Sequence, residues 1–190
     1  SPARRGAILR SRVDATRTLV NAMKAAERPP EVFVSASAVG FYGERGDEML
    51  TEGSAPGAGF LPEVCLAWET HADVAARAGV RTVLLRFGVV LTPAGGALAK
   101  MLPVFRLAAG GRVGTGRQWM SWIHIEDLVR LLMFAIEHPE VDEPINAVAP
   151  QPVTNAEFTA ALAHSVRKPA LLPVPPLALR AAMGEMSALL

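Results

Sequence analysis

The stretch that most constrains the fold is residues 32–43, with the sequence VFVSASAVGFYG. Residues 32–34 are apolar and uncharged, which is typical of a strand buried on both faces in the middle of a parallel sheet. The small residues 35–38 follow, with Gly40 and Gly43 beyond them. Because ligands of open α/β sheets bind outside the carboxyl ends of the strands, this stretch is a candidate ligand site. A plain turn is the alternative interpretation, and the stretch alone leaves both open.

Composition bounds the class of protein. Half of the 190 residues are hydrophobic and the formal net charge is +1, so a sizeable core is expected and a nucleic-acid partner is not. No apolar run is long enough to span a bilayer, which predicts no membrane partner. A single cysteine, Cys65, excludes an internal disulfide framework, and the scattered histidines show no metal-binding spacing. A cytoplasmic location is the default expectation.

The rest of the chain alternates between helical and strand patterns, as a parallel α/β sheet requires. Helices are expected at residues 8–26, 62–78, 97–109 (kinked or broken at Pro103), 127–137 and 177–190, and a further one capped by Thr154 or Asn155 with Glu157 at capping-box spacing. Strands are expected at residues 81–91 and 144–148, a surface loop at 44–59 and an extended Pro-rich segment at 171–176.

Several motifs together resemble one family. SASAVGFYG, LLRFGVVL and SWIHIEDLV are similar to the strand-end, next-strand and FxHVxD signatures of extended short-chain dehydrogenase/reductases, the nucleotide-sugar epimerase superfamily. The combination with GxGRQWMSWIHIEDL and NAVAPQPVTNAEF resembles an atypical, epimerase-like branch, over residues 8–187. The resemblance implies a Rossmann-like doubly wound α/β fold, here its C-terminal half, with a smaller intermixed substrate-side domain. We expect residues 1–92 to belong to the Rossmann domain and residues 93–190 mainly to the substrate-side domain, with some segments returning to the Rossmann core.

Two features of the superfamily are absent. The first is the dinucleotide fingerprint G-x-G-x-x-G between a strand and a helix, so we expect this chain to be a piece of a longer protein. The second is the catalytic Tyr-x-x-x-Lys pair on the helix predicted at residues 62–78. The preferred alignment puts Leu61 and Cys65 at those positions, and the alternative puts Cys65 and Glu69 there. The atypical branch shares this second gap.

The resemblance implies NAD(P) as the cofactor, with NADP preferred. Contacts to it are expected from Ser35, Ala36, Ser37, Gly88 and Val89. The substrate is expected to be a small molecule, either a nucleotide sugar or a carbonyl compound, and a homodimer is one assembly that the resemblance allows.

Gly40, Gln118 and Trp122 are expected to face the substrate. Trp122, with Trp119 and Met120, fits a core as well as it fits a pocket. Ser37 and Tyr42 are the weak catalytic candidates. Without Tyr and Lys, we expect Ser37 to donate a hydrogen bond to a ligand and Tyr42 to form part of the wall.

Cys65 is a third candidate, as a thiol nucleophile with His71 or His124 as its base. A carboxylate at Glu69, one helical turn away, would raise the thiol pKa, so a buried packing role is favoured.

From the resemblance, the predicted function is an NAD(P)-binding epimerase-like or oxidoreductase-like protein of unknown substrate. The alternatives are a non-catalytic nucleotide-binding protein, such as a sensor, and a thiol hydrolase.

Overall fold

The computed structural model describes residues 2–170 and 173, and it divides into two compact units. The first unit is Ser1–Phe87 with Val129–Ala147, and the second is Gly88–Leu128 with Val148–Leu190. The predicted extended segment 171–176 and the predicted helix 177–190 lie outside the described residues, apart from residue 173.

The first unit is built on a three-stranded parallel sheet in the order β1-β2-β6. Its strands are β1 (Val32–Ala38), β2 (Arg81–Phe87) and β6 (Ile145–Ala147). The register places Ser35 opposite Leu84 and Ser37 opposite Arg86. The prediction that the two apolar strands are adjacent and parallel is therefore confirmed.

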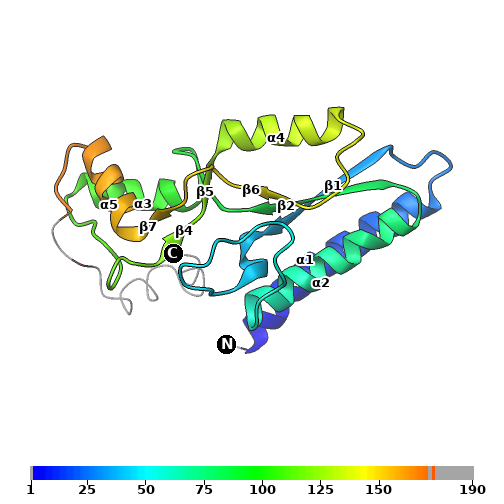
Figure 1. The fold of residues 1–190 in the computed structure, drawn as a ribbon, viewed down its shortest axis with the longest axis horizontal. Helices are drawn as coiled ribbons and strands as arrows, with labels where there is room; N and C mark the ends of the chain where they lie inside the picture. The colour runs from blue at the N-terminus through cyan, green and yellow to red at the C-terminus, as the bar shows by residue number, and fades with distance from the viewer. Residues whose placement is uncertain (1, 171–172, 174–190) are drawn as a thin grey trace. The chain divides into compact units, whose positions relative to one another are not determined.

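Helices cover both faces of this sheet. They are α1 (Pro2–Ala25) and α2 (Phe60–Arg77) on one face and α4 (Ile125–Glu137) on the other (Figure 1). Val20 of α1 and Ala75 of α2 pack with Val80 in a buried cluster. Arg81, at the start of β2, donates hydrogen bonds to the carbonyls of Ala135 and Ile136. These bonds satisfy carbonyls that have no partner within the last turn of α4.

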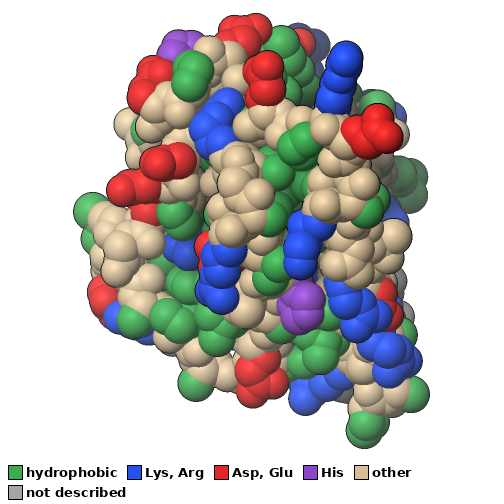
Figure 2. All heavy atoms as spheres, turned by 90° about the vertical axis from the view of Figure 1, so that its right-hand side faces the viewer, with side chains coloured by type: hydrophobic (Ala, Val, Ile, Leu, Met, Phe, Trp, Pro, Cys, Tyr) green, Lys and Arg blue, Asp and Glu red, His purple; other side chains and the backbone are tan. Residues whose placement is uncertain are grey.

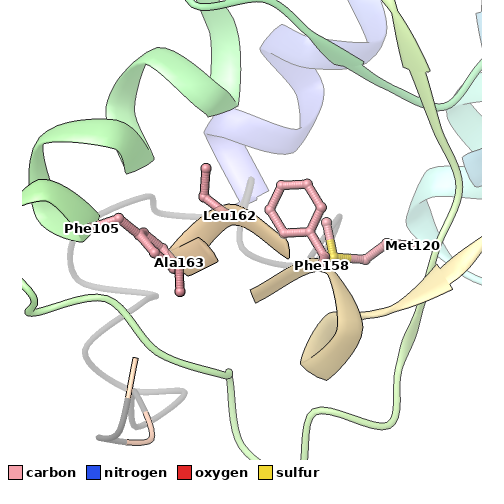
Figure 3. Close-up of a cluster of buried hydrophobic side chains, with 5 residues drawn as sticks. All are labelled: Phe105, Met120, Phe158, Leu162 and Ala163. Carbon is pink, nitrogen blue, oxygen red and sulfur yellow. The ribbon is translucent and has the colours of Figure 1, made fainter. Parts of the chain in front are cut away.

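Within its described residues, the second unit combines short strand pairs with the helices α3 (Gly96–Arg106) and α5 (Asn155–Ser165). Its strand pairs are β3 (Val89–Leu91) parallel to β5 (Trp122–His124) and β4 (Trp119–Met120) antiparallel to β7 (Val153–Thr154). Its core brings Phe105 of α3 together with Met120 and three residues of α5, Phe158, Leu162 and Ala163 (Figure 3). Thr154 caps α5 through the predicted capping box with Glu157.

Four local predictions were wrong in their bounds. The helix expected at residues 8–26 is α1, which already begins at Pro2. The strand expected at residues 81–91 is two strands, because Gly88 separates β2 from β3 and β3 pairs with β5 instead. The small residues after Val34 continue β1 to Ala38, and a 3-10 helix, η1 (Val39–Tyr42), follows. Pro103 does not break its helix, since α3 runs through it and ends at Arg106.

The mixture of side chains on the surface and the lengths of the helices agree with the near-neutral net charge and the absence of long apolar runs in the sequence. Figure 2 shows basic, acidic and hydrophobic side chains interspersed over the face that it displays. Among the described helices, none is both long and apolar enough to cross a membrane.

Candidate functional site

Arg86 lies buried at the carboxyl end of β2, beside Ser37 on β1. A charged side chain inside an apolar strand requires a partner, because an isolated buried charge is strongly destabilising. The partner is Glu69 on α2: Nε of Arg86 lies 2.9 Å from Oε1, and Nη2 lies 2.9 Å from Oε2. Arg86 is 4% exposed and Glu69 is 8% exposed. The two form a buried, bidentate ion pair that ties α2 to the sheet.

The guanidinium of Arg86 has further partners. Its Cζ lies 3.7 Å from the ring centroid of Phe41, within the range of a cation–π contact. Burial acts to lower the pKa of Arg86, but its hydrogen bonds to Glu69 and Tyr42 outweigh that effect and raise the pKa above its ordinary value. The side chain is therefore a permanent cation.

The hydroxyl of Ser37 is committed to the same carboxylate. Its Oγ donates a hydrogen bond of 2.6 Å to Oε1 of Glu69, and the residue is 2% exposed. A serine hydroxyl carries one proton, and an ionised carboxylate only accepts hydrogen bonds. In this arrangement Ser37 retains only acceptor capacity. That it donates to a ligand remains a prediction, which would require this bond to be exchanged.

Tyr42 continues the network toward β6. Its hydroxyl donates to Oδ1 of Asn146 at 2.6 Å and accepts from Nη1 of Arg86 at 2.9 Å. Glu52, in the loop predicted at residues 44–59, accepts from Nη1 of Arg86 through its carbonyl and from the backbone N–H of Asn146 through Oε1. This loop is therefore fastened to the sheet. We call the set the strand-end network: Ser37, Tyr42, Glu52, Glu69, Arg86 and Asn146.

The face of α2 that would carry the Tyr-x-x-x-Lys pair is packed against η1, which directly follows β1. A Cβ at Gly40 would lie 3.5 Å from Cβ of Leu61 and 3.8 Å from Sγ of Cys65. Glu69, one turn further on, binds Ser37. Both alignments of the missing pair thus fall on side chains that face protein.

Cys65 is a packing residue, as predicted. It is 4% exposed and clusters with Phe41 and Tyr42. Burial, and secondly the charge of Glu69, raises the pKa of its thiol to about 11. His71, one of the two proposed bases, places Nδ1 2.8 Å from the carbonyl of Ala67 in its own helix. The structure gives no support to a thiol nucleophile.

A groove of about 350 Å³ runs along β1 in the first unit. Two predicted cofactor contacts, Ser35 and Ala36, line it together with Arg12 of α1 and Trp68 of α2. Ser35 is 3% exposed, and its Oγ donates a long hydrogen bond of 3.4 Å to the carbonyl of Ala36. On the strand side the groove is open and is lined by Phe33, Val34, Ser35 and Ala36.

The other predicted site residues belong to the second unit. A Cβ at Gly88 would lie 2.6 Å from the carbonyl oxygen of Ser121, so only glycine permits this approach of β5. Val89 is opposite Trp122 in the β3–β5 register. The side chain of Gln118 donates through Nε2 to the carbonyl of Val113, which indicates a structural role, and its backbone carbonyl accepts from the N–H of Asn155. The role of each as a cofactor or substrate contact remains a prediction.

Sequence reasoning missed most of the strand-end network. Arg86, Glu52 and Asn146 were not singled out, and Glu69 was considered only as an alignment marker and as a charge near Cys65. One signal was available: Arg86 is the charged residue inside the apolar run TVLLRFGVVL, and such a residue is almost never buried without a partner.

No group of three or more potential metal ligands occurs among the residues that the structure describes.

Comparison with known proteins places these features in context. The model of the NAD dependent epimerase/dehydratase family matches residues 1–148. An epimerase family protein of Mycobacterium bovis is 46% identical over 177 residues, which cover 93% of this chain and 58% of that protein. The chain thus spans less than two thirds of the length of this relative.

Two solved structures resemble the fold. The crystal structure of human epimerase family protein SDR39U1 with NADPH superposes with a TM-score of 0.90 at 33% identity, covering 99% of this chain and 64% of the human one. The nucleoside-diphosphate sugar epimerase from Corynebacterium glutamicum gives a TM-score of 0.78 at 38% identity, covering 100% and 42%. Both likenesses extend over nearly the whole of this chain.

Proposed function

The chain belongs to the NAD dependent epimerase/dehydratase family, and from that premise we propose that it forms part of an NAD(P)-binding protein of epimerase or oxidoreductase type. NADP is the preferred form, because the human relative at 33% identity is described with NADPH. The Rossmann-like sheet, with its parallel strands β1 and β2, supports the proposal. The proposed substrate class is either a nucleotide sugar or a carbonyl compound.

One observation carries the proposal furthest. Ser35 and Ala36, which the sequence predicts as cofactor contacts, line the open groove along β1. Small side chains let a flat ligand approach the backbone of the strand, and Arg12 adds a positive charge that complements the phosphates of a dinucleotide. The remaining predicted contacts are Ser37, Gly88 and Val89. When bound, the nicotinamide supplies hydride transfer, and the residues named here hold and orient it.

A second candidate is a protein that binds the dinucleotide without turnover, as a sensor or regulator. The strand-end network favours it. The hydroxyl protons of Ser37 and Tyr42 are both committed to acceptors within the protein, and the α2 face of the missing Tyr-x-x-x-Lys pair is packed against η1. A proton donor for carbonyl reduction would then have to come from elsewhere in the protein or from the substrate.

Location and assembly are further parts of the proposal. We place the protein in the cytoplasm, as a homodimer, and with a small molecule as its partner. Fractionation of cells and sedimentation of the purified protein test these two points separately from cofactor binding.

Calorimetric titration with NADPH and NADH tests the cofactor assignment. It uses the 190-residue chain and, beside it, the longest chain that its gene encodes. The longest chain is expected to bind NADPH more tightly than NADH. The 190 residues alone are expected to bind weakly or not at all, because they contain no glycine-rich diphosphate loop. Absence of binding to the longest chain would overturn the proposal.

Turnover then separates the two candidates. Oxidation of NADPH is followed with a panel of aldehydes, ketones and 4-keto nucleotide sugars, at cofactor concentrations that saturate the longest chain. Substrate-dependent oxidation that is lost in a variant without dinucleotide binding establishes the enzyme. Tight binding with no turnover on any member of the panel favours the non-catalytic protein.

A further inference from the structure

The indole N–H of Trp122 is buried without a hydrogen-bond partner. Among the residues that the structure describes, it is the one buried side-chain nitrogen or oxygen atom in this state. A buried donor without an acceptor costs roughly 1–3 kcal/mol, and a phenylalanine would avoid that cost. The protein supplies no acceptor for this donor, and an oxygen atom of a bound ligand can provide one.

The β3–β5 pair gives the indole its position. Trp122 is the register partner of Val89, and in a parallel pair such partners direct their side chains to the same face. Val90 and Ile123 form the next pair and direct theirs to the opposite face. The close approach of the two strands at Gly88, where Val89 N donates to the carbonyl of Ser121 at 2.8 Å, holds Val89 and Trp122 in this relation.

We propose that Nε1 of Trp122 donates a hydrogen bond to the carboxamide oxygen of a nicotinamide ring that lies against Val89. This rests on the proposed function, which assigns Val89 to the cofactor. The geometry supplies the direction of the bond: an indole nitrogen is a donor only, so its partner is an acceptor oxygen and not the carboxamide NH₂. Because the N–H is already shielded from water, an oxygen that reaches it gains the bond without a further desolvation cost on the protein side.

The test compares ligands that differ at this oxygen. NADP and its thionicotinamide analogue, whose carboxamide carries sulfur in place of oxygen, are titrated calorimetrically into the longest chain that the gene encodes. Sulfur is the weaker acceptor, so the wild-type protein is expected to bind NADP about tenfold more tightly than the analogue. The variant W122F is expected to bind NADP about tenfold more weakly than wild type and to lose most of this preference.

Unfolding by urea provides a second readout, in which W122F is expected to cause no loss of stability although it lowers the affinity for NADP. W122F removes an unsatisfied donor, so the ligand-free variant is expected to be at least as resistant to urea as the wild type. Replacement of Trp122 by benzothienylalanine, which exchanges N–H for sulfur at nearly constant shape, gives the same comparison without a change in packing. The matched control is W119F, at a residue that is 49% exposed, and it is expected to leave both affinities unchanged.

The outcomes distinguish this inference from the proposal on which it depends. Equal NADP affinity of wild type and both Trp122 variants overturns it and leaves the proposed function standing. An undiminished preference for NADP over the analogue in those variants also overturns it. Failure of the wild-type longest chain to bind NADP overturns the proposed function and this inference together.

Discussion

The hydroxyl of Ser37 donates a 2.6 Å hydrogen bond to Oε1 of Glu69. The same carboxylate accepts hydrogen bonds from Arg86, from Nε at Oε1 and from Nη2 at Oε2. The hydroxyl of Ser37 is thereby oriented by the ion pair of Arg86 and Glu69. This relation joins β1, α2 and β2 at one point, and it determines which chemistry Ser37 can offer. Five predictions can be measured.

Loss of the Ser37 hydroxyl should lower stability. Ser37→Ala removes a buried hydrogen bond to a charged acceptor, which is worth about 1.5–3 kcal/mol. The free energy of unfolding, measured by urea denaturation, is expected to fall by that amount. The control Ser11→Ala removes an exposed serine hydroxyl of α1 and should change stability by less than about 0.5 kcal/mol. Equal effects of the two variants would show that the Ser37 bond contributes nothing specific.

The ion pair between Arg86 and Glu69 should be costly to break from one side only. Arg86→Met leaves the buried carboxylate of Glu69 without its cation and is expected to cost about 3–5 kcal/mol. The double variant Arg86→Met, Glu69→Leu should cost less than the sum of the single variants, because no charge remains unpaired.

The exposed pair of Arg77 and Asp73 is the matched control for this prediction. Its side chains are 73% and 47% exposed, and Arg77→Ala should cost at most about 1 kcal/mol. Strict additivity in the Arg86 and Glu69 cycle would contradict the buried ion pair as the source of the stabilisation.

Cys65 should be unreactive in the folded protein. With its pKa raised to about 11, the thiol is almost entirely protonated near pH 8, and labelling by a disulfide reagent should require unfolding. Rapid labelling of the native protein, at the rate of a small-molecule thiol, would be inconsistent with this burial.

The same pKa shift predicts a pH dependence of stability. The folded thiol titrates at about 11 and the unfolded thiol near 9, so the unfolded state loses its proton first as the pH rises. The contribution of Cys65 is fully present below pH 9 and is lost between pH 9 and about 11, by roughly 3 kcal/mol. Unfolding free energies of wild type and Cys65→Ala should therefore converge over that interval, and a constant difference would refute the shift.

Gly88 should not tolerate a side chain. In Gly88→Ala the new Cβ would lie 2.6 Å from the carbonyl oxygen of Ser121, so β3 and β5 must separate, at a cost of about 1–3 kcal/mol or more. Gly53→Ala, where nothing lies within 4 Å of the added carbon, is expected to be neutral or slightly stabilising. Unfolding curves of the two variants provide the comparison, and equal stability would contradict the close approach at Gly88.

Local patterns in the sequence determined most of the individual elements. The helical spacing before Pro29, the apolar runs at the starts of β1 and β2, and the capping box from Thr154 to Glu157 all act within a few residues of the chain. The pattern of alternating helices and strands likewise predicted the parallel pairing of β1 with β2, and the motifs predicted the family. The packing role of Cys65 followed from its apolar neighbours and from Glu69.

The tertiary structure decided the features that depend on distant neighbours. The split at Gly88 arises because the backbone of Ser121 lies against it, and no local pattern of residues 81–91 encodes that neighbour. The hydrogen bond from Tyr42 to Asn146 joins residues 104 positions apart. The sequence displays the charge of Arg86 but not its partner, because only folding brings α2 over β2 and allows Glu69 to compensate for the desolvation of the guanidinium.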